Sequence, residues 1–424
     1  MWGFRRTTVA GIVFLALIAA LAACGGSEAT VAPTRAPTAT PPTAVPPTDV
    51  PPTAIPFAEL SFFSKLLAGI PDTPDTRQSV MINDYAAVRE LLGLSPAGPD
   101  AKYSVLIQYA IDSVSSDDQE PDPTKFQFKI YTTEDPFISG MGQDAFDLSR
   151  SRREYLAFDG RNVDLSVEAG IGPFKLEVAY GRFDPAATAQ ALEACSECPP
   201  PNIVTHNDVT FYSWGEDRQG DLRNRRNPPA FDHLGRGGRI AVSNEYVYRT
   251  VETPGMKSLI DARARDGRSL ADVEEFRLLG KAMSELAPYA AFFTSQTHKI
   301  DPTMDYSSII GTLPGVQENL IAELGNSSLL LPYLAYTVGA GRDDTGPYLA
   351  LALVHSDAES AEVNQLRLER RISENEDLQD WLEGSEESIL SVEGRVLSAK
   401  ILGERPASTW KSLIFMITPL IPHE

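Results

Sequence analysis

The sequence predicts an α+β fold in which helices pack on antiparallel sheets. Runs that alternate between apolar and polar residues, or are wholly apolar, are typical of strands, and amphipathic stretches that begin at capping residues are typical of helices. Several neighbouring strands are joined by short turns, which favours antiparallel pairing. A strand-helix-strand-strand order also occurs twice, over residues 173–214 and 347–402.

Residues 57–98 predict a helix over 58–70, a turn, a short strand at 79–83 and a second helix that Asp84 caps and Gly93 ends. The sequence pattern is more ambiguous in the next segments. They are a strand or buried helix at 101–115, a strand at 126–132, and mostly helix at 145–170 with a break near Gly160 and Asp164 as a second cap.

The two strand-helix-strand-strand units have matching signals. In the first, Asp184 precedes Pro185 and caps the helix, and two strands flank the turn Asn207-Asp208. In the second, Asp357 caps the helix and two strands flank the turn Glu393-Gly394.

A helix, a proline and a strand precede each unit, at 66–83 and 283–296. We therefore expect two divergent repeats, a first α+β half at 57–287 and a second at 288–424. Between the units we expect a hairpin turning at Asn244 and a helix with a capping box. That box pairs Ser269 with Asp272, and the apolar face of its helix comprises Leu270, Val273, Phe276, Leu279, Met283 and Leu286.

The amino terminus has the plan of an export signal. Arg5 and Arg6 precede the apolar run Val9–Ala23, which is shorter than the about 20 residues that a bilayer-spanning helix needs. Residues 1–23 are therefore predicted to be a signal peptide.

The stretch Leu21-Ala22-Ala23-Cys24 resembles the bacterial lipoprotein signal, in which a cysteine after small residues is acylated and becomes the first mature residue. The resemblance implies that Cys24 carries lipid and that the protein is exported and anchored to the outer face of the cell membrane. Two or three acyl chains anchor durably, since each buried CH₂ contributes about 0.8 kcal/mol. An ordinary signal peptide or an uncleaved anchor is the alternative.

Residues 24–56 repeat a Pro-Pro-Thr pattern. Proline lacks an amide donor and has a fixed φ, so this segment predicts a disordered stalk of polyproline II character. At about 3.1 Å per residue, such a stalk would hold the body tens of ångströms from the membrane.

Export decides how the remaining cysteines are interpreted. Cys195 and Cys198 are the only pair left once Cys24 is lipidated, and an oxidising compartment favours a disulfide between them. A redox centre would need the first cysteine at a helix amino terminus, but here the cysteines follow the helix. A zinc site would need four ligands, and His206 is the only near neighbour.

The net charge of −21 bounds the partners. It becomes more negative when Arg5 and Arg6 leave with the signal peptide, and an acidic body is repelled by nucleic acid and by anionic lipid. We therefore expect no nucleic-acid partner. Apart from the membrane anchor, the partner would be a protein or a small molecule that is neutral or cationic.

Catalytic motifs are mostly missing. The sequence has no GxSxG elbow, and the SxxK match Ser408–Lys411 lacks the other motifs of penicillin-binding enzymes. The glycine-rich run at 235–240 lacks a phosphate-loop lysine and predicts a turn. The histidines show no zinc-binding spacing; they are His206, His233, His298, His355 and His423.

Two charged loops are candidate binding sites. The first offers oxygen ligands that suit Ca²⁺, although a solvated acidic turn is the simpler interpretation; its residues are Asp117, Asp118, Glu120 and Asp122. The second could bind a carboxylate or phosphate, or could neutralise the protein's own carboxylates; its residues are Arg218, Arg223, Arg225 and Arg226.

The lipoprotein signal, the Pro/Thr stalk and the stretch "GRFDPAATAQALEA" together resemble uncharacterised exported lipoproteins of bacteria such as the Chloroflexota. The resemblance implies an α+β body without catalytic residues. We therefore expect a non-catalytic binding or envelope-interaction protein that needs no cofactor. The alternative is an envelope hydrolase whose acid and base are dispersed carboxylates.

Overall fold

Antiparallel strand pairing organises the body in the computed structural model. The described residues all lie in one compact unit, Ala54–Ile300 with Ser328–Glu424. They are 56–91, 155–158, 162–171, 175–196, 199–223, 235–299, 329–374, 388–403 and 420–424.

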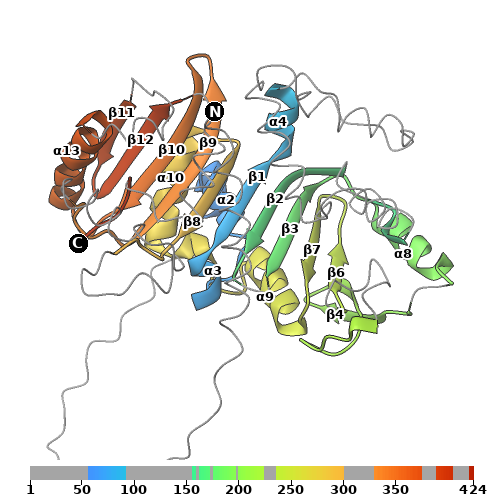
Figure 1. Ribbon diagram of the computed structural model, residues 1–424. Coiled ribbons are helices and arrows are strands. Elements are labelled where there is room, and N and C mark those ends of the chain that lie inside the picture. Colours follow the sequence, from blue (N-terminus) through green and yellow to red (C-terminus); the bar gives the residue numbers. More distant parts are fainter. Residues whose placement is uncertain are drawn as a thin grey trace, which may run out of the picture. The chain divides into compact units, whose positions relative to one another are not determined.

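Twelve strands form one sheet in the order β11-β12-β10-β9-β8-β1-β2-β3-β7-β6-β5-β4 (Figure 1). Every neighbouring pair in that order is antiparallel. The strands are β1 Val80–Asp84, β2 Val163–Ala169, β3 Leu176–Gly181, β4 Asn202–His206, β5 Val209–Ser213, β6 Arg239–Val242, β7 Tyr246–Thr250, β8 Ala290–Thr294, β9 Ala335–Asp343, β10 Gly346–Val354, β11 Ser388–Glu393 and β12 Val396–Leu402.

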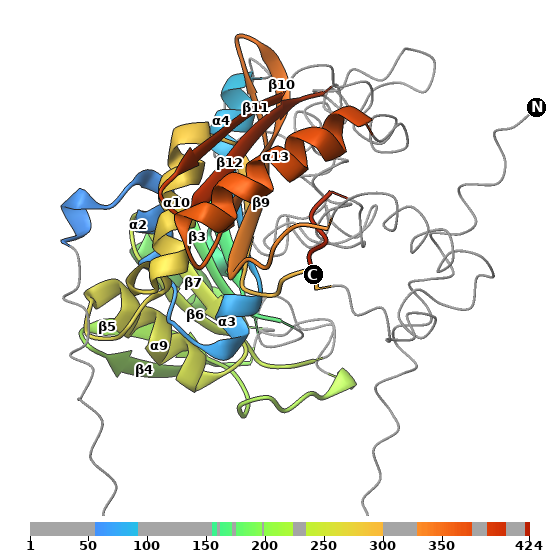
Figure 2. The same cartoon turned by 90° about the vertical axis from the view of Figure 1, so that its left-hand side faces the viewer.

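Helices cover both faces of this sheet. They are η2 Phe57–Glu59, α2 Phe62–Leu67, α3 Pro74–Gln78, α4 Tyr85–Leu91, α8 Pro185–Ala194, α9 Thr253–Ala264, η5 Leu270–Asp272, α10 Glu274–Leu286 and α13 Ala358–Glu374. The apolar residues of α2, α9 and α10 belong to one core cluster, and those of α4, α8 and α13 belong to the other. Figure 2 shows α13 along β11 and β12, with α10 on a different side of these strands.

The centre of the sheet is buried on both sides. Successive residues of β8 alternate between the two clusters, with Phe292 in one and Phe293 in the other, and the whole strand is buried. A strand with two buried faces reads as a continuous apolar run, which is how β8 and β10 appear in the sequence. Because β1 pairs with β8, strands from both sides of the boundary expected near residue 287 share one sheet.

The predicted α+β class is confirmed, and local capping signals account for several helices. Asp184 accepts hydrogen bonds from the amides of Ala186 and Ala187, at 2.9 and 3.0 Å. Asp357 accepts one from Ser360 at 2.8 Å, and Asp84 accepts one from Ala87 at 2.8 Å. Each carboxylate satisfies amides that have no partner within the first helical turn.

The predicted capping box is also present, since the Ser269 amide donates to Asp272 at 2.8 Å. It closes the short 3₁₀ turn η5, and α10 begins after Val273 instead of running on from Ser269. The predicted apolar face packs into the core, with Phe276, Leu279 and Met283 at most 1% exposed.

The prediction of helix over 145–170 is wrong for residues 163–169, which form β2. Every second residue is apolar and buried, and the residues between them, Asp164, Ser166 and Glu168, are polar, which is a strand period. The apolar residues are Val163, Leu165, Val167 and Ala169. The ladders to β1 and β3 stabilise this conformation. Asp164 is therefore not a helix cap.

The helix expected over 58–70 is also interrupted, as η2 and α2 are separate elements. The predicted strand or helix at 101–115 and the predicted strand at 126–132 lie outside the described residues.

The two strand-helix-strand-strand units have the same order of elements but different pairing. In the second, β12 pairs directly with β10. In the first, β5 pairs with β6, and the hairpin β6–β7 separates it from β3. The fold therefore does not establish the predicted pair of repeats.

Candidate functional site

Most of the predicted site residues lie outside the described residues. Cys195 is the carboxyl-terminal cap of α8, and its bond to Cys198 remains a prediction because Cys198 lies outside the described residues. Also outside them are Cys24, Arg225, Arg226 and the candidate calcium ligands Asp117, Asp118, Glu120 and Asp122.

The two described members of the arginine loop each contact a carboxylate of this chain. Arg218 donates to Glu252 at 2.5 Å, and Arg223 donates to Asp221 at 2.7 Å. The Arg218 and Arg223 side chains are 63% and 89% exposed. These ion pairs agree with the interpretation that the loop arginines neutralise the protein's own carboxylates.

Arg239, at the start of β6, is the buried centre of this region and was not predicted from sequence. Its side chain is 2% exposed. The guanidinium donates to the backbone carbonyls of Trp214, Gly215 and Gly237, at 2.9, 3.0 and 2.7 Å. It also lies 2.8 Å from the carboxylate of Asp217. Arg239 therefore fixes the loop that presents Arg218.

Asp217 joins this guanidinium to the first turn of α9. It accepts hydrogen bonds from the Thr253 amide at 2.7 Å and the Thr253 hydroxyl at 2.8 Å. Partial desolvation would raise the pKa of Asp217, but the Thr253 hydrogen bonds and the charge of Arg239 outweigh it and lower that pKa. Asp217 is therefore an ionised structural anchor and not a proton donor.

The glycine-rich run at 235–240 lets two backbone segments approach each other closely. A Cβ on Gly237 would lie 1.7 Å from the carbonyl oxygen of Trp214, and one on Gly235 would lie 1.8 Å from that of Asp221. Close backbone approach, and not phosphate binding, explains these two glycines.

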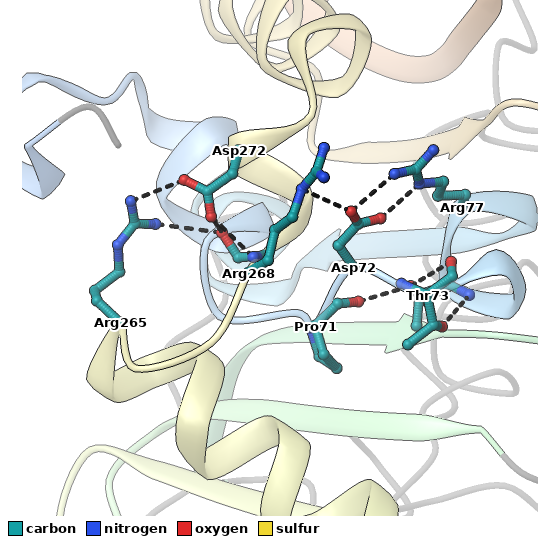
Figure 3. Close-up of polar contacts among 9 residues, drawn as sticks. Pro71, Asp72, Thr73, Arg77, Arg265, Arg268 and Asp272 are labelled. Carbon is teal, nitrogen blue, oxygen red and sulfur yellow. Dashed lines mark hydrogen bonds and ion pairs between the residues drawn. The ribbon is translucent and has the colours of Figure 1, made fainter. Parts of the chain in front are cut away.

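A second ionic cluster joins the loop before α3 to the loop after α9 (Figure 3). The Asp72 carboxylate is 5% exposed and receives Nε and Nη2 of Arg77, at 2.5 and 2.8 Å. Nε of Arg268 lies 3.0 Å from Oδ2 of Asp72, the same oxygen that accepts from Nη2 of Arg77. The Asp72 amide also donates to the Arg268 carbonyl at 3.0 Å. Two arginines on one buried carboxylate form a rigid connection between distant segments.

Next to it, Arg265 donates to Ser269 at 3.2 Å and to Asp272 at 3.1 Å. This guanidinium holds the capping box from outside. Of the three arginine side chains in this region, Arg268 is 60% exposed, Arg77 39% and Arg265 25%. Guanidinium groups at a surface can bind carboxylate or phosphate oxygens.

A third cluster holds the carboxyl terminus. The Tyr333 hydroxyl donates to the Ile421 carbonyl at 2.9 Å, and Arg371 donates to the Leu420 carbonyl at 2.7 Å. The ring of His423 is 3% exposed and packs edge-on against Tyr333, with centroids 4.8 Å apart. His298 contacts the Tyr336 hydroxyl at 2.9 Å.

Burial shifts the protonation of this cluster. It lowers the pKa of His298 to about 4, with a further contribution from His423, and lowers the pKa of Arg371 to about 10. The pKa values of His355 and His423 are lowered for the same reason. Neutral histidines inside a packed terminus indicate a structural role.

Two described carboxylates on neighbouring strands, Asp84 on β1 and Asp164 on β2, have structural partners. Burial raises the pKa of Asp84, which caps α4. Asp164, one strand away, is paired with Arg89, and Arg182 lies 3.3 Å from it. These contacts give both carboxylates a structural role.

No group of three or more His, Cys, Asp or Glu side chains within the described stretches could hold a metal ion. Within the same stretches, none of the helices combines the length and apolar character that crossing a membrane requires.

Neither a protein-family model nor a curated protein matches this chain. Solved structures of the protein TP0453 are similar to it. Crystal form I aligns at 11% identity and a TM-score of 0.33, covering 82% of this chain and 97% of that chain. Crystal form III aligns at 12% identity and a TM-score of 0.32 with the same coverage. At these scores we draw no conclusion from the likeness.

Proposed function

We propose that this protein is an exported lipoprotein, anchored through acylated Cys24 to the outer face of the bacterial cell membrane, and that its body acts by binding and not by catalysis. The observation that carries the proposal is the sequence Leu21-Ala22-Ala23-Cys24 after an apolar run too short to span a bilayer. The Pro/Thr segment 24–56 would then be the stalk.

The way the body begins supports this arrangement. The ring of Phe57, one residue after the stalk, lies 6.0 Å from the guanidinium carbon of Arg263. The same guanidinium lies 5.9 Å from the ring of Tyr180 and 5.5 Å from that of Tyr246. These cation-π contacts attach the first residue of the body to β3, β7 and α9.

The next helix, α2, is held by α10. The Ser61 hydroxyl donates to the Gly280 carbonyl at 3.1 Å, and the Phe63 amide donates to the Ser284 hydroxyl at 3.0 Å. The stalk therefore leads into a helix that is hydrogen-bonded to the packed core of the body.

Acidity and ion pairing support the non-catalytic part of the proposal. The buried or partly buried ionic groups described above, Arg239 with Asp217, Asp72 with Arg77, and Asp164 with Arg89, connect segments of the chain to one another. With a net charge of −21, the body would favour a neutral or cationic partner.

The test is metabolic labelling of bacteria that express the protein with an alkyne fatty acid, followed by membrane fractionation. We expect the wild-type chain to carry label and sediment with membranes, and Cys24→Ala to lose the label and the membrane association. Ser27→Ala is the matched control in the same segment and should behave as wild type. An unlabelled wild-type chain, or Cys24→Ala that stays in the membrane fraction, would contradict the proposal.

A further inference from the structure

β4 is an edge strand of the sheet. Its register with β5 shows which of its backbone N–H and C=O groups point away from the sheet. Asn207 and Asp208 form a two-residue turn with φ of 45° and 61°, and His206 pairs with Val209 on either side of it. In such a hairpin the residues flanking the turn are a hydrogen-bonded pair. His206, Val204 and Asn202 therefore bond to β5, while Ile203 and Thr205 direct their N–H and C=O groups away from the sheet.

These outward groups are open in the described part of the chain, where no hydrogen bond joins them to another described residue. The side chain of Ile203 is 70% exposed, the highest exposure among the described large hydrophobic residues. An exposed, uncharged edge strand is a template for pairing with another strand. No residue of β4 carries a formal charge at neutral pH when its histidine is neutral.

We propose that β4 pairs with β4 of a second copy of this chain, antiparallel and about a two-fold axis at Val204, so that the sheet continues through both copies. In this register Ile203 lies opposite Thr205 of the other copy, and every outward N–H and C=O is used. A register centred on Ile203 would place Thr205 opposite Pro201, which has no N–H. One centred on Thr205 would place Ile203 opposite the turn residue Asn207.

Charge does not oppose a second copy at this edge, although the body is acidic. Asp208, the nearest carboxylate along the strand, lies about 13 Å from Val204 at about 3.3 Å per residue. The two Asp208 would be about 26 Å apart, well beyond the Debye length of about 8 Å. Asp261, on the neighbouring helix α9, accepts hydrogen bonds from His206 and Asn207, at 2.6 and 2.8 Å.

The opposite edge of the sheet differs in this respect. Glu386 and Glu387 precede β11 in the sequence, and Glu393 ends it. Antiparallel self-pairing there would bring acidic residues at one end of β11 toward those at the other. The charge pattern thus selects β4 over β11.

The first test is cross-linking of the mature protein in the oxidising envelope. Val204 would face its own symmetry mate as a non-hydrogen-bonded pair with Cα atoms about 4.5 Å apart, within the range for a disulfide. We expect Val204→Cys to form a disulfide-linked homodimer, and Ser391→Cys on β11, the control, to remain monomeric. A Val204→Cys chain that stays monomeric, or that links only to a different protein, would overturn the proposal.

The second test is sedimentation of the detergent-solubilised mature protein. We expect the wild type to sediment as a dimer, and Thr205→Pro to sediment as a monomer with an unchanged melting temperature, because it removes an outward donor. Ile203→Lys should also be monomeric, since it places two like charges about 8 Å apart across the axis. Ile389→Lys, the same change on β11, should remain a dimer. A monomeric wild type, or a dimeric Ile203→Lys variant, would contradict pairing through β4.

Discussion

The ring of Tyr348 occupies the space that a side chain at Gly341 would need. The two residues are paired across β9 and β10, and a Cβ at position 341 would lie 2.2 Å from a ring carbon of Tyr348. The Tyr348 hydroxyl donates to the Leu286 and Ala287 carbonyls at the end of α10, at 2.5 and 3.0 Å. This ring therefore links the sheet to α10.

We predict that Gly341→Ala lowers the free energy of unfolding by about 1 to 3 kcal/mol, because the ring must move and its hydrogen bonds to α10 weaken. Urea denaturation checks this. Gly267→Ala is the control, since its Cβ would have only ordinary contacts, the nearest at 3.5 Å. If Gly341→Ala and Gly267→Ala had the same free energy of unfolding, the Tyr348 ring would be able to move without cost, which would contradict the prediction.

Gly280→Ala should loosen α2 from α10. A Cβ there would lie 2.6 Å from the Ser64 hydroxyl and 3.0 Å from the Ser64 amide nitrogen, and the backbone atom cannot swing aside. We expect a loss of about 1 to 3 kcal/mol, together with faster proteolysis near residues 60–70. Proteolysis at the wild-type rate would show that α2 is not held at this contact.

Arg239→Gln should be far more costly than Arg223→Gln. The first removes a buried guanidinium and leaves three backbone carbonyl oxygens without this donor, and each buried acceptor that stays unsatisfied costs about 1 to 3 kcal/mol. The second alters a side chain that is 89% exposed and should not change the melting temperature. Similar melting temperatures for both variants would contradict the role of Arg239 in fixing the loop.

Stability should fall as the pH is lowered from 6.5 toward 4. The folded state lowers the pKa of His298 from 6.5 to about 4, so over this interval the unfolded chain binds more protons than the folded one. The loss from this group approaches about 3 kcal/mol by pH 4. The pKa of Asp343, which Lys400 lowers to about 2, adds a further loss only below pH 3.8. We expect His298→Gln to flatten the dependence, as measured by urea denaturation across this range; an unchanged slope would contradict the assignment.

Short-range chemistry made part of this fold predictable. Asp184 and Asp357 cap helices because a carboxylate bonds amides two or three residues on, and the sequence displays that spacing. Asn207-Asp208 produces a hairpin for the same kind of local reason.

Long-range pairing was not predictable. Residues 163–169 read as helix but are a strand because β1 and β3 lie on either side. Asp72 meets Arg268 only through the packing of two loops far apart in the sequence. The sequence did not show which carboxylates pair with the loop arginines, although Asp221 lies only two residues before Arg223.

Mass spectrometry of the amino-terminal peptide of the mature, membrane-extracted protein tests the central claim most directly. The account predicts that the chain begins at Cys24 and that this residue carries two or three acyl chains. A chain that retains residues 1–23, or that begins at an unmodified Cys24, would contradict it.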